Sequence, residues 1–291
     1  MQSAQFQLHA AIEERHWWFV ARRQIVRELI ERVVRPAAGA TIVDVGCGTG
    51  ANLGELAADF RCLGIDTSAE AIELARARFP NVRFVAGTAP RDVAGEMARA
   101  GVVLLMDVLE HVADDFGLFA ELLAATEPGT TFVVTVPAER ALWTVHDEAF
   151  GHYRRYETAR LAQVWQQLPT TTLLLSPFNA RLYPVVRAVR WLNRLRGDSS
   201  GQAGTDFRIP PATANRALTR LFAAEAKRLV AVAEGRSRPY ARGVSLVALV
   251  RREAGPVPAV ARPVAVLPDL YDPVAGTYFL PAGGSPLVSL D

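Results

Sequence analysis

Short runs of apolar, β-branched residues alternate with longer helix-like segments between residues 41 and 136. The runs are almost entirely hydrophobic, which is typical of strands buried on both faces by helices. Repeated β-α-β units of this length predict an α/β protein with a parallel, doubly wound sheet. The expected strands cover residues 41–45, 62–65, 82–86, 102–106 and 131–136, and the helices between them cover 52–58, 69–79, 91–100 and 116–125.

Two further runs, at 171–176 and 244–250, bring the expected sheet to seven mostly parallel strands. Between them the pattern predicts an amphipathic basic helix at 181–196, a Gly/Ser-rich loop at 197–204 and a long helix at 212–233. Another helix, at 10–34, precedes the first strand. We therefore expect an N-terminal cap helix (1–40), a core (41–177), a helical insertion (178–240), the last core strand (241–252) and a proline-rich tail (253–291).

Composition narrows the class of protein. Half of the 291 residues are hydrophobic and 21% are charged, which is typical of a packed globular chain. The formal net charge of +2 gives no overall attraction to nucleic acid, and we expect none as a partner. Two cysteines, Cys47 and Cys62, exclude a disulfide framework. Without a signal-peptide pattern or an apolar run of membrane-spanning length, the sequence predicts a cytoplasmic protein.

A glycine-rich segment follows the first expected strand directly. It reads Asp44-Val-Gly46-Cys47-Gly48-Thr49-Gly50 and runs into a helix. Glycines suit a sharp strand-to-helix turn where a ligand approaches the backbone, and the helix N-terminus offers unpaired N–H groups. The G-x-G-x-G spacing differs from the dinucleotide pattern G-x-G-x-x-G. Because no Gly-Lys-Ser/Thr follows, a P-loop is excluded.

An acidic residue, Asp66, ends the second expected strand, 16 residues after Gly50. A carboxylate at this position can accept hydrogen bonds from the 2′- and 3′-hydroxyls of a ribose. The alternative is a strand-end aspartate that caps the following helix, a role that Thr67 or Ser68 could also fill. The glycine loop and Asp66 together predict a nucleoside-binding site.

These motifs resemble the class I S-adenosylmethionine (SAM)-dependent methyltransferases, through residues 43–50, Asp66 and the segment 107–111 (Asp-Val-Leu-Glu-His). The Leu-Glu-His-Val block is similar to the branch that contains the ubiquinone-biosynthesis O-methyltransferases. Two further blocks, 16–23 and 146–156, also recur in bacterial members. The resemblance covers roughly residues 12–252 and implies a Rossmann-like fold with SAM as the cofactor.

Carried over residue by residue, the resemblance implies a cofactor site. Asp44 and the loop backbone would hold the methionine part, Asp66 the ribose, and the segment after Gly87 the adenine. Many relatives place an aspartate where this chain has Thr88, so we expect adenine recognition by backbone groups. Trp18 would close over the cofactor with Arg22 or Arg23 facing its carboxylate, or the tryptophans would simply dock their helix on the core. The expected cofactor-binding residues are Trp18, Arg22, Arg23, Asp44, Gly46, Cys47, Gly48, Gly50, Asp66, Thr67, Thr88, Ala89, Asp107 and Val108.

Methyl transfer is an in-line displacement at an activated carbon, so the protein mainly has to orient the reactants. A general base is needed only when the acceptor carries a proton, as a phenol does at neutral pH. The candidates are His111, His146 and His152, with Asp147 available to orient an imidazole. His111 could instead cap a helix or pack in the core. Glu110 and His111, taken with His146 and His152, match no standard metal-ligand spacing, so we expect no metal.

The basic helix at 181–196 carries Arg187, Arg190 and Arg194 on one stripe, opposite an apolar stripe that includes Val185 and Val189. The pattern favours a lid over the substrate pocket, with weak contact to an anionic membrane as the alternative. We expect methyl transfer to an oxygen atom of a small, hydrophobic acceptor. The alternatives are transfer to nitrogen, carbon, a lipid-linked or a peptide substrate, and a catalytically silent SAM-fold binding protein.

Overall fold

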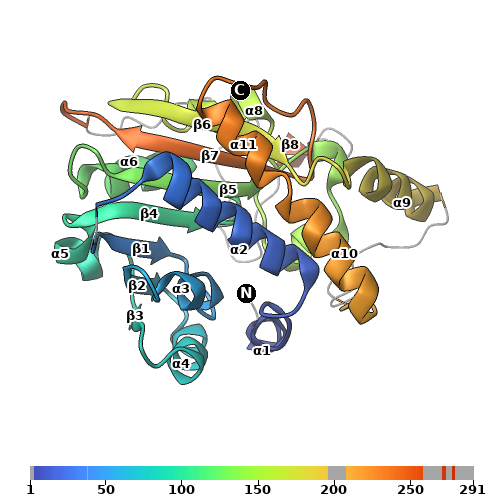
Figure 1. Ribbon diagram of the computed structural model, residues 1–291, viewed down its shortest axis with the longest axis horizontal. Helices are drawn as coiled ribbons and strands as arrows, with labels where there is room; N and C mark the ends of the chain where they lie inside the picture. The colour runs from blue at the N-terminus through green and yellow to red at the C-terminus, as the bar shows by residue number, and fades with distance from the viewer. Residues whose placement is uncertain (1–2, 38, 196–207, 258–270, 273–276, 279–291) are drawn as a thin grey trace.

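The computed structural model describes residues 3–37, 39–195, 208–257, 271–272 and 277–278. Its main sheet has seven strands in the order β3-β2-β1-β4-β5-β7-β6, of which β7 runs antiparallel to both neighbours (Figure 1). The prediction of a mostly parallel seven-stranded sheet is confirmed. The strands are β1 (Thr41–Val45), β2 (Arg61–Asp66), β3 (Arg83–Ala86), β4 (Ala100–Met106), β5 (Thr131–Pro137), β6 (Thr170–Phe178) and β7 (Ser245–Arg252).

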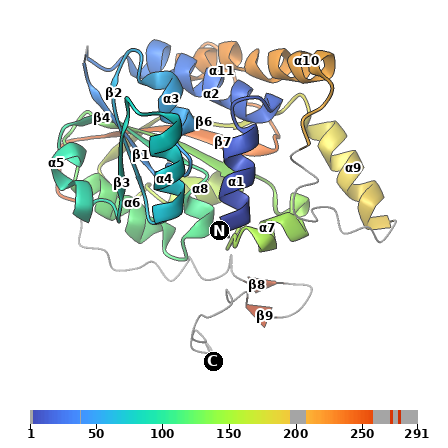
Figure 2. The same cartoon turned by 90° about the horizontal axis from the view of Figure 1, so that it is seen from below.

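Helices cover both faces of this sheet, as a doubly wound fold requires (Figure 2). Strand β4 shows why: Val102 and Leu104 pack in one hydrophobic core, and Val103 and Leu105 pack in the other. All four side chains are fully buried, so the apolar runs reflect burial on two sides. One face carries α2 (Trp17–Leu29), α3 (Ala51–Leu56), α4 (Ala69–Arg78), α10 (Ala212–Ala223) and α11 (Ala226–Ala233), and the other carries α5 (Ala94–Met97), α6 (Asp115–Ala124) and α8 (Thr158–Gln163).

Three predicted helices are wrong in their extent. The expected helix at 10–34 is two helices, α1 (Ser3–Ile12) and α2, followed by a π-helical turn at Ile30–Val34. The break occurs where the His16 backbone N–H turns back to the Ile12 carbonyl, at 2.8 Å, and the His16 ring accepts a hydrogen bond from Trp18 N, at 3.3 Å. The expected helix at 91–100 is a 3₁₀ turn (Arg91–Val93) followed by the one-turn helix α5.

The third wrong extent is the expected helix at 212–233, which divides into α10 and α11 at Glu225. The buried Glu225 carboxylate accepts hydrogen bonds from the backbone N–H groups of Ala180 and Arg181, at 3.2 and 2.9 Å. These contacts tie the break to the segment after β6. The helices do form an insertion before the last strand, as predicted.

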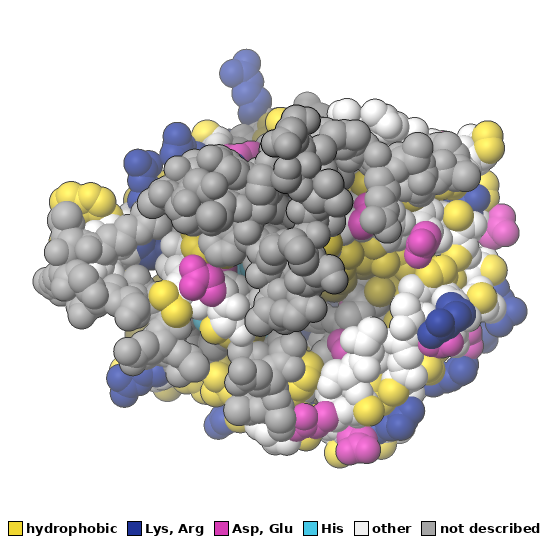
Figure 3. All heavy atoms as spheres, turned by 180° about the vertical axis from the view of Figure 1, so that it is seen from behind, with side chains coloured by type: hydrophobic (Ala, Val, Ile, Leu, Met, Phe, Trp, Pro, Cys, Tyr) yellow, Lys and Arg dark blue, Asp and Glu magenta, His cyan; other side chains and the backbone are white. Residues whose placement is uncertain are grey.

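Two expectations fall largely outside the described residues: the loop at 197–204 and most of the tail at 253–291. Within the tail the structure describes two short antiparallel strands, β8 (Tyr271–Asp272) and β9 (Thr277–Tyr278). In the described part of the chain, no helix is both long enough and apolar enough to cross a membrane. The described side chains on the face shown in Figure 3 mix basic, acidic and hydrophobic groups, consistent with the near-zero net charge.

Helices α1 and α9 (Tyr183–Leu195) lie beyond the carboxyl ends of the parallel strands (Figure 1). Glu13, just after α1, is held to the glycine loop because its carboxylate accepts hydrogen bonds from Thr49 Oγ1 and from the Arg78 guanidinium. A short helix, α7 (Val145–Ala149), lies in the connection after β5. These elements enclose the edge of the sheet at which open α/β proteins bind ligands.

Candidate active site

A cavity of about 980 Å³ opens at the carboxyl ends of the parallel strands. This volume is at the upper end of small-molecule sites, with room for two ligands side by side. All five histidines of the chain line it, including His9 and His16, which the sequence reading did not propose. The predicted residues that line the cavity are Trp18, Arg22, Gly46, Cys47, Gly48, Asp66, Thr67, Thr88, Ala89, Asp107, Val108, His111, His146 and His152.

One part of the cavity wall, which we call the nucleoside half, consists of the loop at 46–49, Asp66–Ser68 and Gly87–Ala89. The loop is fixed to β2 because Gly46 N and Cys47 N both donate to the Ile65 carbonyl, at 2.8 and 3.1 Å. Gly46 and Gly48 have positive φ angles of 72° and 52°, a region that favours glycine. The loop therefore presents backbone to the cavity.

Asp66 lies at the centre of the nucleoside half. Its Oδ2 accepts a hydrogen bond from Gly48 N at 2.9 Å, and its Oδ1 accepts one from Ser68 N at 2.9 Å. The capping role belongs to Ser68, whose Oγ accepts from Ala71 N at the start of α4. Because each carboxylate oxygen can accept more than one hydrogen bond, Asp66 keeps acceptor capacity for a ribose diol.

Three predicted cofactor residues do not line the cavity: Asp44, Gly50 and Arg23. Asp44 is fully buried beneath the loop, where burial raises its pKa to about 7 and Asn52 Nδ2 donates to it at 3.3 Å. A Cβ on Gly50 would lie 2.7 Å from the Phe84 ring, so this glycine allows close packing behind the loop. Arg23 does not line the cavity and instead forms an ion pair with Glu55, with its Nε 3.2 Å from Glu55 Oε2.

The arginine at the cavity is Arg22, which forms an ion pair with Asp107 and stacks 4.4 Å from the Trp18 ring. Asp107 has a positive φ of 59°, rare for a residue other than glycine, and accepts a hydrogen bond from Thr135 Oγ1 at 3.1 Å. Strained backbone of this kind concentrates at functional sites. A cation and an anion thus lie side by side on the wall, beside the glycine loop.

The opposite wall, which we call the histidine half, contains Glu110, His111, His146, His152 and the inner face of α9. The rings of His111 and His152 meet edge to face, with centroids 4.6 Å apart. His146 packs instead on the Phe150 ring, at 4.2 Å. Burial, followed by the neighbouring His152, lowers the pKa of His111 to about 3 and keeps its imidazole neutral.

Asp147 orients His152 and not the adjacent His146. Its Oδ1 lies 2.9 Å from His152 Nδ1 and accepts a hydrogen bond from Arg155 Nε at 2.8 Å. Burial alone would raise the pKa of Asp147, but the bond to His152 and the Arg155 charge hold it well below its usual range. Asp147 is therefore an anion that fixes the ring of His152.

Glu110 is a site residue that the sequence suggested only as part of a metal set whose spacing matches no standard motif. It is fully buried in the 3₁₀ turn Leu109–His111, and neither carboxylate oxygen has a hydrogen-bond partner among the described residues. Burial, followed by the charge of Asp107, raises its pKa well above the usual range. The sequence shows Glu110 within the Leu-Glu-His block, but it does not show that the side chain points to the cavity.

Helix α9 contributes the outer wall of the histidine half. Val185, Val189 and Arg190 line the cavity, and the Arg190 guanidinium donates to the Leu142 carbonyl. Arg190, which was expected on the basic stripe, thus lines the same cavity as the valines, whereas Arg187 does not. Trp191, which does not line the cavity, is 59% exposed.

Comparison with known proteins identifies the family. Residues 18–181, more than half of the chain, match the family described as "Methyltransferase domain". The chain belongs to this family, within the class I SAM-dependent methyltransferases, and its cofactor is S-adenosylmethionine. The residues present fit that cofactor: Asp66 for the ribose, and the paired Arg22 and Asp107 for a carboxylate and an ammonium group.

Curated relatives match only part of their length. A probable S-adenosylmethionine-dependent methyltransferase of Mycolicibacterium smegmatis is 29% identical over 53% of this chain and 59% of its own. A trans-aconitate 2-methyltransferase of Paracidovorax citrulli is 33% identical over 41% and 46%. A ubiquinone biosynthesis O-methyltransferase of Methylobacterium sp. (strain 4-46) is 34% identical over 33% and 41%. The chain thus spans about half the length of the curated relatives it matches.

Solved structures support the fold alone. A putative methyltransferase solved with the Trm112 activator of Haloferax volcanii has a TM-score of 0.50 at 18% identity, covering 87% of this chain and 95% of that chain. The plantazolicin methyltransferase BamL has a TM-score of 0.50 at 14% identity, covering 87% and 90%. Both agree with the Rossmann-like architecture predicted from the sequence.

Proposed function

We propose that this protein transfers a methyl group from S-adenosylmethionine to an oxygen atom of a small, hydrophobic acceptor in the cytoplasm. The observation that carries the proposal is the division of one cavity into two chemically different halves, one with a glycine loop and Asp66, the other with histidines and the valines of α9. When bound, the cofactor supplies an electrophilic methyl group attached to a sulfonium.

The nucleoside half would bind and orient the cofactor. Asp66 would accept the ribose hydroxyls, and the backbone at Gly87–Ala89, which lines this half, would face the adenine. Arg22 and Asp107 would receive the amino-acid end. The Trp18 ring, stacked on Arg22, would exclude water from that end.

The histidine half would hold the acceptor. His152 is the best-positioned base, because Asp147 occupies its Nδ1 and leaves Nε2 to take a proton from a hydroxyl. His111 and His146 remain candidates, and both line the same wall. The name of the ubiquinone-biosynthesis relative specifies oxygen as the atom methylated, which supports the proposed acceptor atom.

Helix α9 would act as a lid whose inner face touches the acceptor. Val185 and Val189 are 59% and 49% exposed, yet both line the cavity, so a bound apolar acceptor would cover them. Contact with an anionic membrane would instead use Trp191. Sedimentation with anionic vesicles separates the two roles: a lid gives no binding to vesicles, whereas binding that Trp191→Ala abolishes would favour the membrane.

Purified protein incubated with methyl-labelled S-adenosylmethionine and separate pools of phenolic, carboxylic, amine and lipid-linked acceptors tests the function. We expect label in a phenolic or carboxylic pool. Label only in an amine pool would mean that the methylated atom is nitrogen and not oxygen. Binding of the cofactor in calorimetry without transfer to any pool would favour a silent binding protein, and no cofactor binding at all would contradict the proposal.

A further inference from the structure

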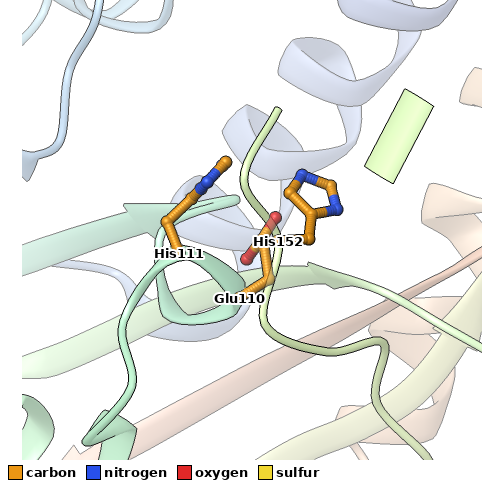
Figure 4. A group of neighbouring side chains, drawn as sticks. All are labelled: Glu110, His111 and His152. Atoms are coloured by element: carbon orange, nitrogen blue, oxygen red, sulfur yellow. The ribbon is translucent and has the colours of Figure 1, made fainter. Parts of the chain in front are cut away.

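Three potential metal-ligating side chains converge in the histidine half. One ligand atom each from Glu110, His111 and His152 lies within 4.8 Å of the other two. Figure 4 shows these side chains reaching toward one another from two segments, the turn after β4 and the chain after α7. The Tyr153 backbone N–H donates to the Glu110 carbonyl at 2.7 Å, which fixes the two segments in register.

The Glu110 carboxylate lies at the wall of the cavity. It is fully buried, and both oxygens lack a hydrogen-bond partner among the described residues. A buried polar group without a partner is costly, so such a group in a folded protein needs an explanation. The two arginines on this part of the wall form ion pairs with other carboxylates, Arg22 with Asp107 and Arg155 with Asp147.

The contacts around His152 fix the orientation of its ring. Its Nδ1 is occupied by the fully buried Asp147, at 2.9 Å, so Nε2 is the ring atom left for another partner. A carboxylate on the far nitrogen is the usual outer support of a metal-bound histidine, because it fixes the tautomer and the ring orientation. Thr144 N in turn donates to Asp147 Oδ2 at 2.8 Å, and this bond holds the support in place.

We infer that Glu110, His111 and His152 bind a divalent transition-metal ion, with Asp147 as the positioning residue of His152. Two imidazoles and one carboxylate suit zinc, iron(II), manganese(II) or cobalt(II) better than calcium. The ligand atoms would approach one another by an ångström or so on binding, since zinc lies about 2.0–2.2 Å from each ligand. The spacing of Glu110, His111, His146 and His152 matches no standard metal motif, so the sequence predicted no metal, whereas the structure brings three of these four together.

Three protein ligands leave a coordination position open, as in catalytic and not structural sites. All three residues line the cavity, so that position would face the acceptor. Resting on the proposed function, the inference narrows the acceptor to a molecule with a hydroxyl or carboxylate oxygen that the ion can hold. Metal binding itself does not depend on methyl transfer and can be tested alone.

The test uses EDTA-treated full-length protein titrated with Zn²⁺ by calorimetry and with Co²⁺ by visible absorption. We expect one ion per chain, and cobalt bands of low-symmetry nitrogen–oxygen coordination. Glu110→Gln, His111→Ala and His152→Ala should each abolish the cobalt bands. Asp147→Asn should weaken Zn²⁺ binding about 10- to 100-fold while keeping the stoichiometry, as expected for outer support.

His146→Ala is the matched control, because His146 lines the same wall outside the trio and should leave ion affinity unchanged. Wild-type protein that binds neither ion would overturn the inference, whatever the folding of the variants. Equal binding by wild type and Glu110→Gln would also overturn it. Cofactor affinity measured in EDTA reports on the proposed function separately, so either proposal can fail while the other stands.

Discussion

The two halves of the cavity are built in opposite ways. In the nucleoside half, the carboxylate that lines the cavity is satisfied by neighbours close in sequence or on the adjoining loop: Asp66 bonds to Ser68 two residues on and to Gly48. In the histidine half, the wall is assembled from distant segments, and Glu110 is left without a partner.

This difference indicates where each half obtains its specificity. Because its hydrogen bonds hold Asp66 in place, the ribose acceptor is organised before the cofactor arrives, which reduces the cost of binding. A wall with an unsatisfied buried carboxylate is stable only because the surrounding fold supports it, and such strain is usual where chemistry occurs. The nucleoside half should therefore govern affinity for the cofactor, and the histidine half should govern rate.

The largest expected effect is on rate. His152→Ala should lower kcat about 10²- to 10⁴-fold and leave cofactor affinity within about twofold, because the cofactor rests on the other half. Steady-state kinetics with calorimetry of cofactor binding measures both. His146→Ala and His111→Ala are made in parallel, and melting temperatures check that each variant folds.

The kinetic variants also separate a base from a metal ligand. If His152 is only a base, raising the pH toward the acceptor's own pKa should restore part of the rate of His152→Ala. If it holds an ion, treating wild-type enzyme with EDTA should reproduce the loss. Near-normal turnover of all three histidine variants would contradict the assignment of rate to the histidine half.

A smaller effect is expected in the nucleoside half. Asp66→Ala removes charge-assisted hydrogen bonds worth roughly 1.5–3 kcal/mol, so S-adenosylmethionine should bind about 10- to 100-fold more weakly. Titration calorimetry measures the affinity. Since Asp66 also anchors Gly48, Asp66→Asn, which keeps one acceptor oxygen, is the matched control and should lose less. Unchanged affinity in a folded Asp66→Ala protein would remove the ribose assignment.

The same contrast explains what the sequence could predict. The strand–loop–helix unit at 41–56 and the aspartate at the end of β2 follow from local pattern, because the carboxyl ends of parallel strands meet at one edge. The predicted residues of this half lie at the cavity except Asp44 and Gly50, which support the loop from beneath. Local spacing cannot distinguish a residue that lines a cavity from one that packs behind it.

The histidine half could be predicted only in part. The three candidate histidines do line one wall, but the sequence did not say which imidazole Asp147 orients; it is His152, five positions on. His9 escaped notice because it precedes the expected helix at 10–34, whereas in the structure it belongs to α1, a separate helix that ends at Ile12. The inward turn of Glu110 depends on the 3₁₀ geometry after β4, which no apolar periodicity encodes.

Glu110 is the residue at which the two halves differ most, and its burial makes the stability of the protein depend on pH. Burial makes the folded protein hold the Glu110 proton to a pH well above the ordinary pKa of 4.5. Between the ordinary and the raised pKa the folded state binds more protons than the unfolded state. Glu110 therefore stabilises folding fully only below the ordinary value, and this contribution is lost as pH rises toward the raised pKa.

Glu110→Gln removes this titration, so the free energy of unfolding of the variant should rise relative to that of wild type as the pH increases. The gain in free energy of unfolding should be at most about 1.4 kcal/mol per pH unit, measured by denaturant unfolding of EDTA-treated proteins from pH 5 to pH 8. Asp115→Asn is the contrasting control, because the buried Asp115 carboxylate is fully engaged by Tyr156 and Arg160, at 2.8 Å each. It should destabilise the protein throughout that range. A difference between Glu110→Gln and wild type that stays constant with pH would mean that Glu110 is solvated in the folded protein, and the contrast between the two halves would then rest on geometry alone.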